Sequence, residues 1–169
     1  MSYKNVSMFI KKTLKSKAVL FLFSISAIAI DQVFKFFVKN YLKNSEGFCI
    51  IPNFLYFTYV ENTGIAFGML KDLGWIFITV TSVFLTVAVF ILIRAKIESN
   101  FLKISLALVI GGGVSNLIDR VFFGYVVDYF SFSFFAPVCN FADYFVTIGG
   151  ICLLFCFLFC KEDLFGVRK

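Results

Sequence analysis

The chain has 169 residues, of which 60% are hydrophobic and only 15% are charged, and its formal net charge at pH 7 is +6. Soluble domains are closer to half apolar and a quarter charged, so this composition, with a mean hydropathy of +0.93, excludes a disordered chain, a disulfide scaffold and an ordinary soluble enzyme. A membrane-spanning helix needs about 20 apolar residues, and the length therefore allows four spans with modest external segments in a single domain, residues 1–169.

Four apolar runs predict four transmembrane helices, at about residues 18–38, 74–93, 104–123 and 141–160. The first run follows a basic stretch and contains Ala27-Ile28-Ala29, a combination that also fits a cleavable signal peptide. The apolar character continues beyond that point through Val33 and Phe34, and cleavage would leave an odd number of spans. We therefore expect the first span to be retained.

Two segments, about residues 39–73 and 124–140, join the spans on one side of the membrane. The first contains an aromatic and β-branched run at 54–60 followed by a turn signal at 62–64, and it predicts a small β element on the membrane surface. The second is apolar and aromatic and predicts an interfacial loop or a short amphipathic helix. The expected fold is therefore an all-α membrane protein with four transmembrane helices, a small β element on the membrane surface and an interfacial loop or helix.

Basic residues lie mainly at the opposite ends of the spans, because 11 of the 16 Lys and Arg residues are found in the N-terminal stretch, the connection 94–103 and the tail. The positive-inside rule then predicts that both termini are cytoplasmic and that the segments 39–73 and 124–140 face outward. The positive net charge needs no nucleic acid as a partner, because basic loops beside spans are attracted to anionic membrane lipid.

The sequence contains no histidine, which excludes Ser-His and Cys-His catalysis and histidine-ligated zinc or haem. The five cysteines form no CxxC motif, so they indicate neither a metal site nor a redox pair. Cys152, Cys156 and Cys160 are spaced four apart on one face of the last apolar run, where small residues are typical of helix packing in a membrane.

Acidic residues in or beside the apolar runs are functional candidates, because a charge in hydrocarbon costs several kcal/mol. Asp31 and Lys35 are four residues apart and share one face of the first span. A local ion pair that holds the end of that helix is one interpretation. A contact to the substrate, or to the residues around a site, is the other.

Asn116, Asp119 and Arg120 lie together on the third span. Asp119 and Arg120 are adjacent, so on a helix they point about 100° apart and cannot both face lipid. The planar guanidinium of Arg120 could clamp a carboxylate or a backbone carbonyl. The run of glycines at 111–113 predicts a close approach of another helix, but such packing does not explain the three polar residues.

Asp128 and Asp143 are the predicted catalytic pair. Asp128 follows the third span and Asp143 opens the fourth, so both lie at the outer surface, with enough chain between them to bring the carboxyls together. Two carboxyls that share a site hold one proton, so one can take a proton from water while the other polarises an amide carbonyl and serves the leaving amine. The alternative is that both cap helices or reach toward water, and Asn140 is either an N-cap or a site donor.

Five sequence blocks, in this order, resemble those of the lipoprotein signal peptidases (signal peptidase II), four-span aspartic endopeptidases of bacterial inner membranes. The blocks are Asp31 to Lys35, Asn62 to Gly68, Gly112 to Arg120, Val126 to Tyr129 and Asn140 to Asp143. The resemblance implies that Asp128 and Asp143 are catalytic. It also implies a set of substrate-binding or site-supporting residues: Asn62, Gly64, Asn116, Asp119, Arg120, Asn140, Asp31 and Lys35.

The resemblance further implies the reaction. The substrate would be a prolipoprotein with a diacylglyceryl-modified cysteine, cut just before that cysteine at the periplasmic face of the membrane. No metal and no cofactor would be needed, and the cyclic peptide globomycin would inhibit the enzyme. The sequence departs from the usual family residues at Ser115 (Gly), Tyr129 (Phe), Cys139 (Phe) and Tyr144 (small), without loss of a catalytic group.

Two other functions stay open from the residues alone. A proton-coupled carrier would use Asp31, Asp119 and Asp143 as a relay, although the chain has no inverted repeat. A non-catalytic membrane assembly partner would need neither carboxyl of the pair. The resemblance favours the peptidase over both.

Overall fold

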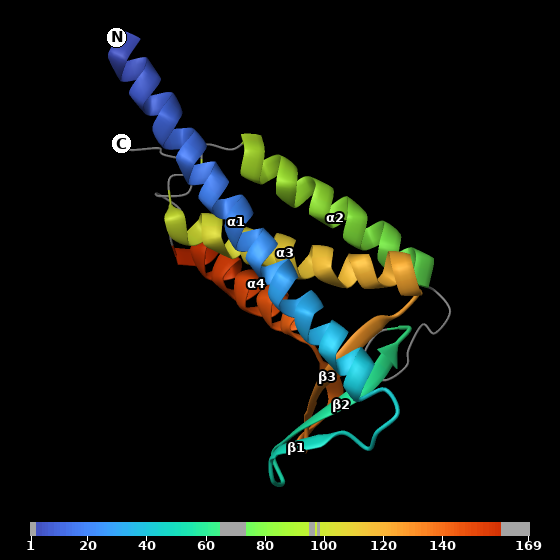
Figure 1. Ribbon diagram of the computed structural model, residues 1–169. Helices are drawn as coiled ribbons and strands as arrows, with labels where there is room; N and C mark the ends of the chain where they lie inside the picture. The colour runs from blue at the N-terminus through green and yellow to red at the C-terminus, as the bar shows by residue number, and fades with distance from the viewer. Residues whose placement is uncertain (1–2, 65–73, 95–96, 98, 160–169) are drawn as a thin grey trace.

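The computed structural model describes residues 3–64, 74–94, 97 and 99–159, and within them the chain forms four helices with a small sheet at one end (Figure 1). The helices are α1 (Tyr3–Tyr41), α2 (Gly74–Arg94), α3 (Asn100–Phe123) and α4 (Phe141–Phe159). The strands are β1 (Phe48–Ile51), β2 (Leu55–Asn62), β3 (Val126–Phe132) and β4 (Phe135–Cys139). Several residues used in the predictions lie outside the described residues: Ile65 to Gly68, Lys71, Lys96, Cys160, Lys161, Arg168 and Lys169.

Each of the four helices contains a stretch that is long and apolar enough to cross a membrane. The stretches are Leu20–Tyr41, Trp75–Arg94, Asn100–Phe123 and Phe141–Phe159. Their number agrees with the prediction, and α1 continues well beyond its apolar stretch toward the N-terminus. The most apolar window of α3 is 44% buried, against at most 28% in the other helices, so α3 is the central helix.

Three consecutive glycines, Gly111, Gly112 and Gly113, bring α3 against all three other helices. Successive residues of a helix point about 100° apart, so each glycine faces a different neighbour. A Cβ atom added at any of them would lie within 3.0 Å of an atom of the facing helix. The contacts are Gly111 with Ser24 and Ala27 of α1, Gly112 with Ala142 of α4, and Gly113 with Leu85 of α2. The predicted close approach at these glycines is confirmed.

The four strands form one antiparallel sheet in the order β1-β2-β3-β4. Strands β2 and β3 pair with Asn62 opposite Val126 and with Val60 opposite Asp128. The register of this pair shifts between Phe57 and Val60, as in a β-bulge. The β element that the sequence predicts within 39–73 is present as β1 and β2.

The segment 124–140 forms β3 and β4, so the prediction of an interfacial loop or a short amphipathic helix there is wrong. Gly124 ends α3 in the left-handed conformation, with φ of 80°, and its N–H donates to the carbonyl oxygen of Arg120. The residues of β3 are mainly β-branched or aromatic and pair with β2. A partner strand that is distant in sequence therefore decides the conformation of an apolar segment whose composition fits either element.

A cluster of buried side chains holds the sheet against the end of α1. Val38 of α1 packs with Val127 and Tyr129 of β3, and all three are at most 4% exposed. Phe57 of β2 and Phe141 at the start of α4 pack around them. The cluster places β3 beside both the end of α1 and the first turn of α4.

Candidate active site

Asp128 and Asp143 both accept hydrogen bonds from Asn140. Asp128 lies in β3, is 2% exposed, and accepts hydrogen bonds from Nδ2 of Asn62 at 2.8 Å and from Nδ2 of Asn140 at 2.6 Å. Asp143 lies in the first turn of α4, is half-buried, and accepts from Nδ2 of Asn116 at 2.9 Å and from the backbone N–H of Asn140 at 3.0 Å. Asn140 thus contacts both carboxyls, and the structure brings the predicted pair together.

Asn140 is also the N-cap of α4. Its Oδ1 accepts the backbone N–H of Asp143 at 2.9 Å, while the carboxylate of Asp143 accepts the backbone N–H of Asn140. This reciprocal pair has the form of a capping box, which satisfies two N–H groups at a helix start. The helix cap and the donor to the pair, which the sequence left as alternatives, are both supplied by this one side chain.

The strand register places Asn62 beside Asp128. Val60 lies directly opposite Asp128, and Asn62, two residues further along β2, projects from the same face of the sheet. Such a diagonal neighbour is within reach of a polar side chain. The backbone N–H of Gly64 donates to Oδ1 of Asn62 at 3.1 Å, which leaves Nδ2 of Asn62 to donate to Asp128.

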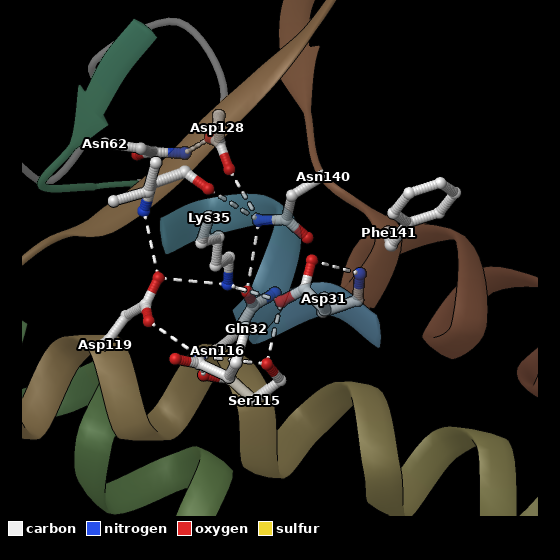
Figure 2. A network of polar contacts seen from close by, with 12 residues as sticks. Asp31, Gln32, Lys35, Asn62, Ser115, Asn116, Asp119, Asp128, Asn140 and Phe141 are labelled. Atoms are coloured by element: carbon white, nitrogen blue, oxygen red, sulfur yellow. Dashed lines mark hydrogen bonds and ion pairs between the residues drawn. The ribbon is translucent and has the colours of Figure 1, made fainter. Parts of the chain in front are cut away.

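Lys35 is the centre of a buried ionic network formed by side chains of α1 and α3 (Figure 2). Its Nζ lies 2.7 Å from Oδ2 of Asp31 and 3.0 Å from Oδ2 of Asp119, and these three residues are at most 3% exposed. Lys35 also donates to Oδ1 of Asn116 at 2.8 Å. This contact fixes the Asn116 amide so that its Nδ2 points to Asp143. The predicted ion pair of Asp31 and Lys35 is confirmed, and it is connected to the residues around the pair.

Asp119 joins this network to the strand that carries Asp128. Its Oδ2 accepts the backbone N–H of Val127 at 3.0 Å, and Val127 directly precedes Asp128. Its Oδ1 accepts Nε2 of Gln32 at 2.8 Å. A residue at the end of α3 therefore fixes the backbone of β3 one residue away from the carboxyl.

Three further polar side chains belong to the network, although the sequence prediction assigns them no role there. Nε2 of Gln32 donates to Oγ of Ser115 at 3.1 Å, and Oγ of Ser115 donates to Oδ2 of Asp31 at 2.7 Å. The hydroxyl of Tyr129 donates to Oδ1 of Asp31 at 3.1 Å. Gln32 is signalled by its polarity within an apolar span, and Ser115 by its place one helical turn before Asp119. The sequence marks the hydroxyl of Tyr129 only as a departure from the Phe that is usual in the family, and this departure names no partner for it.

Arg120 stands apart from this network. Its guanidinium lies over the ring of Phe77 in α2, 5.5 Å from the ring centroid. The side chain is half-buried, and its charge attracts the carboxylates of Asp128 and Asp143. No ion pair or hydrogen bond joins the guanidinium to a carboxylate or a backbone carbonyl of the described residues, so the predicted clamp on a group of the chain itself is not found there.

Burial and the negative charge of Asp143 raise the pKa of Asp128 to about 7 from an ordinary value of 3.8, although the hydrogen bonds from Asn62 and Asn140 act in the opposite direction. Asp128 therefore keeps its proton up to about neutral pH. A protonated carboxyl beside an ionised one is the state that acid–base hydrolysis of an amide requires.

In the part of the chain that the structure describes, no group of three or more His, Cys, Asp or Glu side chains could hold a metal ion.

Comparisons with known protein sequences point to one family. The sequence model of the signal peptidase (SPase) II family matches residues 23–159. A lipoprotein signal peptidase of Caldanaerobacter subterraneus is 39% identical over 132 residues, which cover 78% of this chain and 90% of that protein. The corresponding protein of Clostridium tetani is 38% identical over 146 residues, covering 84% of this chain and 92% of that protein.

Solved structures agree as well. One that is described as a bacterial membrane enzyme has a TM-score of 0.79 and 28% identity, and it covers 90% of this chain and 93% of that chain. A second with the same description has a TM-score of 0.76 and 30% identity, and it covers 84% of this chain and 94% of that chain. The chain therefore belongs to the signal peptidase II family and is a multi-pass membrane peptidase.

Proposed function

We propose that this peptidase removes the signal peptide from diacylglyceryl-modified prolipoproteins, that it cuts just before the lipidated cysteine, and that Asp128 and Asp143 are its catalytic pair. The family and its named relatives support the removal of signal peptides from prolipoproteins. The observation that carries the assignment of the pair is the position of Asn140, which donates to both carboxyls. The proton-coupled carrier is not favoured, because the relatives are peptidases.

The proposed reaction uses one proton on the pair. Asp143, which is half-buried, takes a proton from water as the water oxygen attacks the scissile carbonyl carbon, and protonated Asp128 gives its proton to the carbonyl oxygen. When the tetrahedral intermediate collapses, Asp143 gives the proton to the leaving nitrogen as the C–N bond breaks. Asp128 recovers its proton from a hydroxyl of the intermediate, so the pair returns to its starting state.

The surrounding residues hold the pair in place for this reaction. Asn62 and Asn140 orient Asp128, while Asn116, held by Lys35, orients Asp143. Arg120 is in a position to bind a backbone carbonyl of the substrate, because its guanidinium makes no hydrogen bond to the described residues.

The site is proposed to face outward from the bacterial inner membrane, with both termini in the cytoplasm. The sheet lies at one end of the helix group, and α1 begins and α4 ends at the opposite end (Figure 1). The pair lies at the sheet end, because Asp128 is in β3 and Asp143 is in the first turn of α4. Basic residues concentrate in the sequence before the first span, between the second and third spans and after the fourth, as the positive-inside rule expects of a cytoplasmic side. The acyl chains of the substrate would then hold the scissile bond at a fixed depth beside the pair.

A gel-shift assay tests this function directly. The full chain in detergent is incubated with a diacylglyceryl-modified prolipoprotein, beside Asp128→Asn and Asp143→Asn variants whose folding is checked by thermal unfolding. We expect a mobility shift with the unaltered chain alone, and we expect globomycin to block it. Cleavage at an unchanged rate by either folded variant would refute the catalytic pair. A folded, unaltered chain that leaves intact a substrate cut by another signal peptidase II would refute the proposed reaction.

A further inference from the structure

The first turn of α4, which carries Asp143, has its four free N–H groups satisfied by side chains, two of its own cap and two from α1 and β3. A helix start normally leaves four backbone N–H groups without a partner inside the helix. Here the four hydrogen bonds run from Asn140 N to Asp143 Oδ2, from Phe141 N to the Tyr129 hydroxyl, from Ala142 N to Asp31 Oδ1 and from Asp143 N to Asn140 Oδ1. The turn is therefore held from α1 and β3 as well as by its own cap.

Tyr129 supplies the contact that joins β3, which bears Asp128, to the first turn of α4, which bears Asp143. Its hydroxyl accepts the N–H of Phe141 at 3.1 Å and donates its single hydrogen to Oδ1 of Asp31, also at 3.1 Å. Tyr129 directly follows Asp128 in β3, and Phe141 lies two residues before Asp143 in α4. The hydroxyl thus links the residue after Asp128 to the backbone two residues before Asp143.

We propose that the hydroxyl of Tyr129 is a positioning group for the peptidase reaction, which holds the turn bearing Asp143 against the strand bearing Asp128. This inference rests on the proposed catalytic pair. The hydroxyl touches neither carboxyl, so it acts through Phe141 and Asp31 rather than on the reacting atoms.

The aromatic ring and the hydroxyl of Tyr129 can be separated by one substitution. The ring is fully buried and packs against a group of rings that a phenylalanine would contact equally well: Phe34, Phe57, Phe130 and Phe141. Tyr129→Phe therefore keeps this packing and removes only the acceptor for the Phe141 N–H and the donor to Asp31. The first turn of α4 is then fixed by fewer contacts. Because Tyr129 is fully buried, we expect the substrate to bind as before.

The expected result for Tyr129→Phe is a fall in kcat of about 10-fold with an unchanged KM, because small displacements of reacting groups reduce rates steeply. Tyr59→Phe is the matched control. It removes a hydroxyl from the same sheet, but that hydroxyl contacts Glu61 and Tyr125 rather than the pair. This control is expected to keep the kcat of the unaltered chain.

The experiment measures kcat, KM and thermal unfolding for the full chain in detergent, together with amide hydrogen exchange of residues 140–143. Support would be a lower kcat per folded molecule and faster exchange in Tyr129→Phe alone. The inference is overturned if Tyr129→Phe has the kcat of the control, or if its loss of activity only follows a loss of folded protein. Asp128→Asn and Asp143→Asn are assayed alongside. If they are inactive while Tyr129→Phe is fully active, this inference fails alone, and if they are active the catalytic pair itself fails.

Discussion

The two carboxyls of the pair differ in their surroundings, and this difference favours Asp128 as the acid and Asp143 as the base of the proposed reaction. Asp128 is 2% exposed and lies between the amides of Asn62 and Asn140, whereas Asp143 is half-buried at a helix start. A buried carboxyl beside a negative charge is the one that retains a proton. The more accessible Asp143 is then the group that can reach an attacking water.

This division predicts the pH dependence of the reaction. The proposed mechanism needs protonated Asp128, whose pKa is about 7, so kcat should fall as the pH rises above about 7. A kcat profile from pH 5 to pH 9 on a lipidated prolipoprotein checks this, and a constant kcat up to pH 9 would contradict it.

The same raised pKa of Asp128 lowers the stability of the folded chain at high pH. The contribution of this carboxyl is complete below pH 3.8, its ordinary value, and is lost as the pH rises through about 7.

Site residues could be predicted from the sequence where their charge is unusual for their position. Acidic residues at the edges of apolar runs indicate Asp31, Asp119, Asp128 and Asp143, and the structure places all four around one site. The hydroxyl of Tyr129 could not be predicted, because its partners lie in α1 and α4 and only the packed fold brings them together.

At the scale of the elements, α3 positions the site by its contact with α4. A Cβ atom at Gly112 would collide with the backbone oxygen of Ala142, the residue just before Asp143. Gly113 faces a side chain instead, because its nearest neighbour is Leu85 of α2. Backbone cannot move aside without moving the helix, whereas a leucine side chain can change its conformation.

The two glycines therefore predict different outcomes. Gly112→Ala should displace the first turn of α4, cost about 1–3 kcal/mol of stability and lower kcat at least about 10-fold. Gly113→Ala is the control and should lose much less activity. Thermal unfolding and kcat of both variants test this, and equal losses in the two variants would show that the contact of Gly112 with α4 does not position the site.

The elements themselves were predictable to different degrees. The spans follow from long apolar runs, whose signal is local, and all four are present. The segment 124–140 is different, because its apolar and aromatic residues suit an interfacial helix and a strand alike. Its conformation is decided by pairing with β2, and by the bulge that sets Asn62 near Asp128, and neither is visible from the segment alone.

At the scale of the whole molecule, the proposed orientation can be tested with a natural label. Cys49 lies in β1, is exposed and has a free thiol, so it marks the side of the membrane on which the sheet lies. A membrane-impermeant maleimide should label intact spheroplasts that express the chain, and Cys49→Ser should remove most of the signal. Labelling of Cys49 that requires permeabilised membranes would place the sheet, and the site with it, on the cytoplasmic side.

The network that holds the pair begins at Asp31 in the first span and ends at Asp143 in the fourth. During synthesis, a chain that has inserted only three spans lacks both Asp143 and the turn on which Asp31 and Tyr129 converge. On the proposed mechanism, such an intermediate cannot cut the peptides that pass through the same membrane. We therefore expect proteolytic activity only when the last span is in place, so that cleavage of the proposed lipidated substrate can serve as a reporter of complete membrane insertion.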